Sequence, residues 1–189
     1  MVWHEKVLDR AGRDAARRLA LAAGGDFYLA GGTGLALRLG HRSSLDLDLF
    51  SGGRLLDRSD RLALKKTLDA SGKLEILEEK DGTCHLRLGK TAVSLFHYPY
   101  KLLKPASEWS GLKVASVEDI AAMKLSAVIS RGSKKDFIDL FFICRTRKAA
   151  DLFKWAERKF PGHPNFSVKA AKALVYFEDA EKEPMPRML

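Results

Sequence analysis

Two aspartates separated by a single leucine, Asp46 and Asp48, have the type and spacing to do chemistry. They lie in the run SSLDLDLFS (43–51), whose apolar alternation predicts a β-strand with both carboxylates on one face and the leucines toward the core. In a partly buried cleft two such charges repel each other unless a cation lies between them. Carboxylate oxygens suit Mg²⁺ or Mn²⁺, so the pattern predicts a divalent-metal site. Taken alone, it fits equally an edge strand whose charged face points into solvent.

A glycine-rich turn precedes the aspartates. Gly31, Gly32 and Thr33 follow a short buried strand, FYLAG (27–31), and open a predicted helix, TGLALRLG (33–40), with Thr33 as its cap. Glycines let a triphosphate approach the backbone closely, and a helix N-terminus offers it unpaired N–H groups. The segment between Thr33 and Asp46 is long enough for one short helix and a return to a neighbouring strand. The sequence therefore predicts a phosphate-binding turn beside the metal site.

The elements that position these residues change character near residue 110. Before it, the periodicity predicts further helices over 4–24 and 57–72 and further strands over 73–80, 83–90 and 91–98. After it, we expect a last strand at 113–116 and helices over 116–132, 133–146, 149–160 and 167–180. Residues 181–189 are expected to fray. The outline is a mixed α/β half over 1–110 followed by an all-helical half over 111–189.

Two stretches of the sequence resemble known families. GGT followed by D-L-D at this spacing resembles the signature of the nucleotidyltransferase fold of the DNA polymerase β type. More narrowly, LAGGTGLALRLGHRSSLDLDLF with AMKLSAVISRGSKKDFIDLFF resembles the AbiEii-type nucleotidyltransferase toxins of bacterial toxin–antitoxin and phage-defence systems. The resemblance covers 28–51 and 116–142 closely. It implies an α+β fold, with a polymerase β-like nucleotidyltransferase core and mixed sheet over 1–110 and an all-helical C-terminal lobe over 111–189.

The resemblance also implies roles for individual residues. In the first stretch, the nucleotide-binding positions fall on Gly31, Gly32, Thr33, Arg42 and Ser44, and the metal-binding carboxylates on Asp46 and Asp48. In the second stretch, a helical lysine and a Lys-Asp-x-x-Asp motif fall on Lys124, Lys135, Asp136 and Asp139. Lys124 and Asp136 are expected to act in catalysis with the aspartate pair, with Asp139, Lys135 and Arg131 as additional site residues.

One departure from the polymerase β pattern concerns a third carboxylate. Many enzymes of that type carry it on a neighbouring strand, but the candidate strand TAVSLFHY (91–98) has none: Ser94 faces one side and His97 ends the other. Either Asp136 or Asp139 supplies a substitute from the helical half, or catalysis uses two carboxylates.

The helical motif also has ordinary structural readings. Lys124 lies among apolar neighbours, as a lysine that extends its amine to solvent would. Asp136 and Asp139 are three residues apart and share a helix face, which also fits a salt-bridged surface with Asp136 complementing the helix dipole. From the residues alone these readings compete with the catalytic ones.

The composition indicates which kinds of partner and environment suit the protein. A net charge of +9, from 33 Lys and Arg against 24 Asp and Glu, favours a polyanion, either nucleic acid or a nucleoside triphosphate, although a solubility surface would explain it too. The two cysteines, Cys84 and Cys144, lack metal-ligand spacing and indicate a reduced, cytoplasmic protein. The longest uncharged run, 27–37, is too short to span a membrane, and we expect no signal peptide.

These observations, with the resemblance, predict a metal-dependent nucleotidyltransferase toxin. It would transfer NMP from an NTP to an RNA acceptor, with the tRNA 3′ end as the implied target and an antitoxin as partner. One alternative is transfer to a small molecule, as in aminoglycoside-modifying relatives of the fold, which calls for an acidic cleft. Another is a scaffold that binds nucleotide or RNA without turnover, which the missing strand carboxylate would explain.

Overall fold

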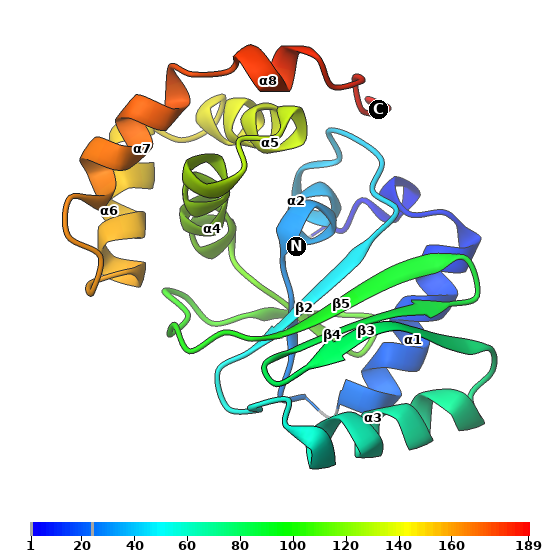
Figure 1. Ribbon diagram of the computed structural model, residues 1–189. Coiled ribbons are helices and arrows are strands. Elements are labelled where there is room, and N and C mark those ends of the chain that lie inside the picture. The colour runs from blue at the N-terminus through cyan, green and yellow to red at the C-terminus, as the bar shows by residue number, and fades with distance from the viewer. Residues whose placement is uncertain (1, 24) are drawn as a thin grey trace.

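A computed structural model describes residues 2–23 and 25–189. Its centre is a seven-stranded mixed sheet in the order β3-β4-β5-β2-β1-β7-β6 (Figure 1). The β2–β5 and β1–β7 pairs are parallel and the other pairs are antiparallel. The strands are β1 Tyr28–Leu29, β2 Leu47–Ser51, β3 Leu74–Lys80, β4 Thr83–Leu88, β5 Thr91–His97, β6 Ser107–Trp109 and β7 Leu112–Val114.

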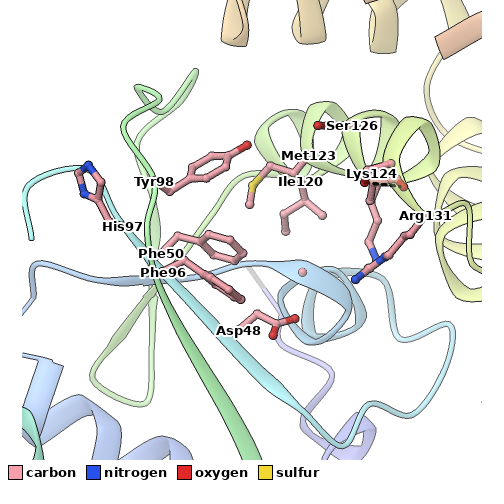
Figure 2. Close-up of a pocket in the computed structure, with 13 residues that line it drawn as sticks. Asp48, Phe50, Phe96, His97, Tyr98, Ile120, Met123, Lys124, Ser126 and Arg131 are labelled. Atoms are coloured by element: carbon pink, nitrogen blue, oxygen red, sulfur yellow. Dashed lines mark hydrogen bonds between the residues drawn. The ribbon is translucent and has the colours of Figure 1, made fainter. Parts of the chain in front are cut away.

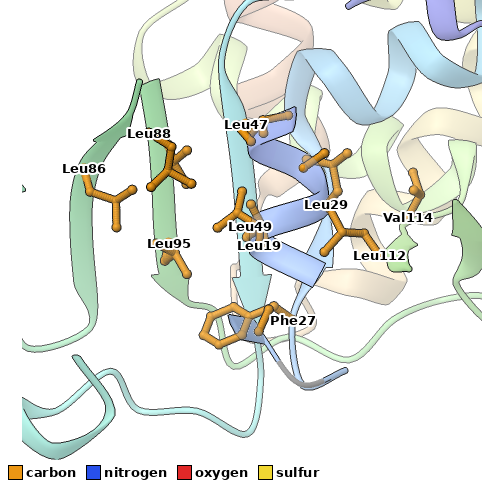
Figure 3. Packing of buried hydrophobic residues seen from close by; sticks show 14 of the residues in the cluster. Leu19, Phe27, Leu29, Leu47, Leu49, Leu86, Leu88, Leu95, Leu112 and Val114 are labelled. Carbon is orange, nitrogen blue, oxygen red and sulfur yellow. The ribbon is translucent and has the colours of Figure 1, made fainter. Parts of the chain in front are cut away.

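One face of the sheet carries the first core. Helices α1 (Arg10–Ala23) and α3 (Arg58–Ala70) cover this face, and the short 3-10 helix η1 (Glu5–Val7) precedes them. Leu47 and Leu49 of β2 point into this core, where they pack with Leu19 of α1 and Leu95 of β5 (Figure 3). Because side chains alternate along a strand, this packing turns Asp48 and Phe50 to the opposite face.

The opposite face is covered by the helical half. It comprises α4 Val117–Ser130, α5 Lys134–Cys144, α6 Ala149–Lys159, α7 Phe166–Leu174 and α8 Glu178–Glu181, and it packs on α2 (Gly31–Leu39). A second core joins Tyr28 and Leu35 of the first half to Ile120 and Leu125 of α4. The predicted α+β fold is confirmed: a mixed sheet is followed by helices that close over one of its faces.

Several local predictions are confirmed. Asp57 accepts a hydrogen bond from the Asp60 amide and caps α3, and Gly40 ends α2 in the left-handed conformation. The Ser116 hydroxyl accepts from the Asp119 amide at 3.0 Å, which makes the expected cap of α4.

Other local predictions are wrong. Helix α2 begins at Gly31 with Ala30 as its cap, so Thr33 lies inside the first turn. The helix expected over 4–24 is broken at residues 8 and 9, where the Asp9 carboxylate accepts from the Gly12 amide. Strand β6 was not expected, and the sheet continues to Val114 before α4 begins at Val117. The helix expected over 167–180 ends at Leu174, and the short α8 follows separately.

The C-terminal residues do not fray. The Ser43 amide donates to the Arg187 carbonyl at 2.9 Å, and Arg42 and Met188 form an isolated β-bridge. The Lys134 amide donates to Glu183 at 3.0 Å, which ties the same tail to the start of α5. These backbone pairings, which join segments far apart in the chain, hold the tail across α5 onto the loop that precedes β2.

Candidate active site

The glycine turn lies directly against the Asp48 carboxylate. Gly31 has a φ of +59°, a conformation that glycine adopts without strain. A side-chain carbon at Gly31 would lie only 2.5 Å from Asp48 Oδ2, and one at Gly32 would collide with the Arg42 guanidinium. Both glycines leave room for the Asp48 and Arg42 side chains, which lie against the backbone of the turn.

Thr33 and Ser44 shape the loop that carries Asp46. Their hydroxyl oxygens lie 2.6 Å apart, and the Thr33 hydroxyl also donates to the Asp46 carbonyl. Both residues are buried, whereas Asp46 is exposed just before β2 begins. The sequence placed these two hydroxyls on the nucleotide, but in the structure they engage each other and the backbone next to the aspartate pair.

Asp48 lies on β2 opposite Ser94 of β5. Burial raises the pKa of the Asp48 carboxyl above its ordinary value; the charge of Lys124 opposes this rise, and the charge of Asp46 adds to it. The position paired with Asp48 therefore carries a hydroxyl, not a third carboxylate. Across residues 2–23 and 25–189, no group of three or more His, Cys, Asp or Glu side chains could hold a metal ion.

The aspartate pair nevertheless fits a hard divalent cation. Mg²⁺ is commonly bound by one or two carboxylates, with waters and substrate phosphates completing its shell. A cation beside Asp48 and Asp46 would offset both the burial and the mutual repulsion that raise the Asp48 pKa.

Two cations from α4 and its C-terminal cap face Asp48 across a cleft. Lys124 Nζ lies 2.9 Å from Asp136 Oδ1 and 2.6 Å from Asp139 Oδ2. Arg131 forms two hydrogen bonds to Asp136, at 2.8 and 3.0 Å, while its side chain stays 65% exposed. Burial alone would raise the pKa of Asp136, but the hydrogen bonds from Arg131 and Lys124 outweigh it and hold the pKa at about 2.

A third cation joins the same group from the first half of the chain. The Arg42 guanidinium donates two hydrogen bonds to Asp139, at 2.7 and 2.9 Å, and His41 Nε2 lies 2.8 Å from the same carboxylate. Burial would raise the pKa of Asp139, but the hydrogen bonds from His41 and Arg42 and the charge of Lys124 hold it well below its usual range. We call these six residues the cleft network: His41, Arg42, Lys124, Arg131, Asp136 and Asp139.

The cleft network changes three sequence-based interpretations. Arg42 is only 3% exposed, so its guanidinium is committed to Asp139 and does not line the cleft. Asp136 and Asp139 are 0% exposed and are surrounded by cations, so neither stands in for the missing strand carboxylate. Lys124 does not extend to solvent but lines the cleft. Lys135 is exposed on α5 and does not line the cleft, and its part in binding stays a prediction.

An aromatic wall faces the two cations from the other side of Asp48 (Figure 2). Phe50 and Phe96 are stacked with their ring centroids 5.2 Å apart, and Tyr98 meets Phe50 edge-on at 5.3 Å. Sequence reasoning missed these rings. The alternation that turns Asp48 outward also turns Phe50 outward, and the β2–β5 register pairs Phe50 with Phe96, so the signal was present in the strand pattern.

The cleft has a volume of about 350 Å³. The residues that line it and matter most here are Gly31, Asp48, Phe50, Phe96, Tyr98, Met123, Lys124 and Arg131. The structure therefore brings together the glycine turn, Asp48 and Lys124, which are far apart in sequence, and adds Arg131 and the rings. A metal-compatible carboxylate that faces two cations can bind the phosphates of a nucleotide, and the rings on its other side offer a surface for stacking.

The family model for "Nucleotidyl transferase AbiEii toxin, Type IV TA system" matches residues 16–188 of this chain. The chain belongs to the AbiEii family. It is also similar to the uncharacterized protein aq_aa25 of Aquifex aeolicus (strain VF5), with 36% identity over 183 residues that cover 94% of this chain and 87% of the relative.

Two solved structures share the fold of this AbiEii protein. The antibiotic-resistance factor ANT(2'')-Ia aligns with a TM-score of 0.57 at 16% identity, over 84% of this chain and 96% of that one. MenT4, the nucleotidyltransferase toxin Rv2826c of Mycobacterium tuberculosis H37Rv, aligns with a TM-score of 0.51 at 16% identity, over 91% and 84%. At such low identity these likenesses show the fold alone.

Family membership makes the protein a nucleotidyltransferase of the toxin–antitoxin class, and it implies an NTP as substrate and an antitoxin as partner. Among the helices of the described chain, 2–23 and 25–189, none has the length and apolar character to cross a membrane.

Proposed function

We propose that this AbiEii protein transfers a nucleoside monophosphate from an NTP to a hydroxyl of an RNA, with Mg²⁺ or Mn²⁺ as cofactor. The specific acceptor that we propose is the 3′ end of tRNA, whose modification would stop translation and so account for toxicity. The observation that supports transfer best is the position of Asp48, which lies beside the glycine turn and opposite Lys124 and Arg131 in one cleft.

Asp46 and Asp48 would hold the metal. When bound, a divalent cation neutralises phosphate charge and polarises the phosphorus that is attacked. The remaining work belongs to residues of this chain. The backbone of Gly31 and Gly32 at the start of α2 receives phosphate oxygens. Lys124 and Arg131 stabilise the negative charge that develops on the departing pyrophosphate.

The buried members of the cleft network position these groups. Asp136 binds both Lys124 and Arg131, and Asp139 links Lys124 to Arg42, whose guanidinium lies against the backbone of Gly32. Thr33 and Ser44 fix the backbone of Asp46. In this assignment Asp136 is a positioning residue, and the catalytic carboxylates are Asp46 and Asp48.

Charge supports RNA as the proposed acceptor. Among the described residues that line the cleft, Asp48 is the only acid, and the chain carries a net charge of +9. A cationic aminoglycoside would need further carboxylates, whereas RNA would be attracted. The pairing of Asp48 with Ser94, where a third carboxylate is absent, favours one second candidate, a nucleotide- or RNA-binding protein without turnover.

One experiment separates these functions. The protein is incubated with each labelled NTP and total tRNA, in Mg²⁺ and in EDTA, and the RNA 3′ ends are sequenced. Metal-dependent label on RNA that disappears with Asp48→Asn supports transfer. If labelled NTP is retained with the protein in a filter-binding assay but never becomes covalently attached to RNA, the protein binds nucleotide without turnover. Label on RNA in EDTA contradicts metal dependence.

A further inference from the structure

The two walls of the cleft give the proposed reaction a direction. Phosphoryl-type transfer places the attacking and the leaving oxygens roughly in line through the phosphorus. Lys124 and Arg131 lie on one side of Asp48, and Phe50, Phe96 and Tyr98 lie on the other (Figure 2). If pyrophosphate departs toward the cations, the attacking hydroxyl arrives from the aromatic side.

The aromatic side continues out of the cleft. Tyr98 lines the cleft, and the Tyr100 ring lies 4.8 Å from it, centroid to centroid. Tyr100 in turn lines a second groove of about 490 Å³, between the segment 99–103 and the C-terminal end of α6. Tyr100 is held there by an edge-on contact with Phe160 at 4.8 Å and a 2.8 Å hydrogen bond between its hydroxyl and His163.

The second groove carries positive charge without acids. In the part of the chain that the structure describes, its charged lining residues are Lys101, Arg158 and Lys159, and no Asp or Glu lines it. Lys159 is neutralised by the buried Asp119, 2.7 Å away. Lys101 and Arg158 are exposed, and neither belongs to an ion pair in the described part of the chain. Two uncompensated cations therefore border the outer end of a row of rings.

We propose that this groove, with Tyr98 and Tyr100, binds the single-stranded 3′ segment of the RNA acceptor and leads its terminal hydroxyl into the cleft. Aromatic rings that stack bases, beside cations that contact the phosphates, are the way in which proteins hold single-stranded nucleic acid without reading its sequence. A duplex cannot use the rings, because its bases are already stacked and paired. The proposal rests on the proposed function, since it takes RNA as the acceptor.

The test measures binding without chemistry. A short 5′-fluorescein single-stranded RNA and a blunt duplex RNA are titrated by anisotropy across a salt series, in EDTA and without NTP. Lys101→Ala/Arg158→Ala should weaken single-strand binding about tenfold and lower the salt slope by about 0.7 per lost phosphate contact. Tyr100→Leu should weaken it by a similar factor, while Tyr100→Phe, which keeps the ring, should not.

The matched control removes the same charge from another face. Arg58 and Lys66 are exposed on α3, on the side of the sheet away from the cleft. Equal losses from Arg58→Ala/Lys66→Ala and from Lys101→Ala/Arg158→Ala would overturn the groove, because only net charge would then matter. Equal losses on duplex and single strand would overturn the stacking path. Because neither result depends on turnover, an inactive protein that still binds single strands at this groove would count against the proposed transfer and not against the groove.

Discussion

Two groups of mostly buried charges link the helical half to loops of the first half, and they are built differently. The cleft network sets three permanent cations, Arg42, Lys124 and Arg131, against two carboxylates, Asp136 and Asp139. The second group is a single pair, Lys159 and Asp119, at 2% and 0% exposure. The first group has a surplus of positive charge and the second is neutral.

The two groups also differ in their hydrogen bonds. Asp119 accepts from the Leu103 and Lys104 amides, from the Ser116 hydroxyl and from Lys159, so it fastens three segments together. Lys124 and Arg131 instead share Asp136, Lys124 also contacts Asp139, and both cations line the cleft. Charge surplus beside an open cleft indicates a site for an anion, whereas a balanced pair with all acceptors used indicates a fastening.

The largest effect is expected from removing the charge that the cleft cations face. Asp48→Asn should lower transfer on the order of 1000-fold, because metal stabilisation worth several kcal/mol would be lost. Burial raises the pKa of Asp48, so its ionised form is unfavourable in the folded state at neutral pH, and that cost fades as pH falls through the raised pKa.

The same variant should therefore unfold at a higher temperature than the wild type in metal-free buffer at pH 7. Calorimetry with and without Mg²⁺ checks this, since Mg²⁺ should stabilise the wild type and not Asp48→Asn. Near-normal turnover, or equal Mg²⁺ stabilisation of both proteins, would remove the carboxylate from the metal site.

The next largest effect is expected at Lys124. Lys124→Met removes a cation that would stabilise the leaving pyrophosphate, and we expect the transfer rate to fall about 100-fold. Lys124→Arg keeps the charge and should recover part of the rate. Single-turnover kinetics at saturating NTP separate this loss from weaker binding. A loss confined to KM would make Lys124 a ground-state contact only.

The balanced pair should behave in the opposite way. Asp119→Ala leaves the buried Lys159 without a counter-ion, and we expect a loss of about 3–5 kcal/mol in the free energy of unfolding. NTP affinity, measured at a temperature where the variant is folded, should stay within about twofold of the wild-type value, because neither residue lines the cleft. Asp119→Asn, which keeps an acceptor, should lose less stability. A large change in the NTP affinity of the folded variant would contradict a purely structural role for the Lys159–Asp119 pair.

Much of this arrangement was predictable from local patterns. Alternation identified β2, β4 and β5, and capping residues marked the starts of α3 and α4. Glycines before a helix and acids on one strand face predicted the meeting of Gly31 with Asp48. These features depend on residues close together in sequence, where spacing determines geometry.

The remainder depends on contacts between distant segments. Arg42 reads as a phosphate contact in sequence, yet it is bound by Asp139, 97 residues away. Asp136 and Asp139 read as exposed or metal-binding acids because spacing does not show how many cations surround them. The three-residue β6 is too short for periodicity, and the C-terminal tail pairs through its backbone, which leaves no side-chain signal. The aromatic wall could have been found, since Phe50 shares a face with Asp48.

The smallest effect is a pH dependence that distinguishes the cleft network from a neutral fastening. The pKa of Asp136 is held at about 2, below its ordinary value of 3.8, by Arg131 and Lys124 acting against burial. A carboxyl with a lowered pKa stabilises the fold above its ordinary pKa, and this stabilisation is lost as pH falls through the folded value. The shift corresponds to about 2 kcal/mol, which should disappear between about pH 4 and pH 2.

The comparison of wild type with Asp136→Asn isolates this contribution, because Asp139 and the other carboxyls titrate in both proteins. Denaturant unfolding at a series of pH values should show the wild type more stable at pH 7 and the difference shrinking toward pH 2. At neutral pH the variant leaves Lys124 with Asp139 alone and frees Arg131, so NTP binding should weaken at the same time as stability. A stability difference that stays constant down to pH 2 would mean that Asp136 acts through packing and hydrogen bonding alone. The ionised carboxylate of Asp136 would then contribute nothing to stability, and the cleft network would differ from the Lys159–Asp119 pair in geometry alone.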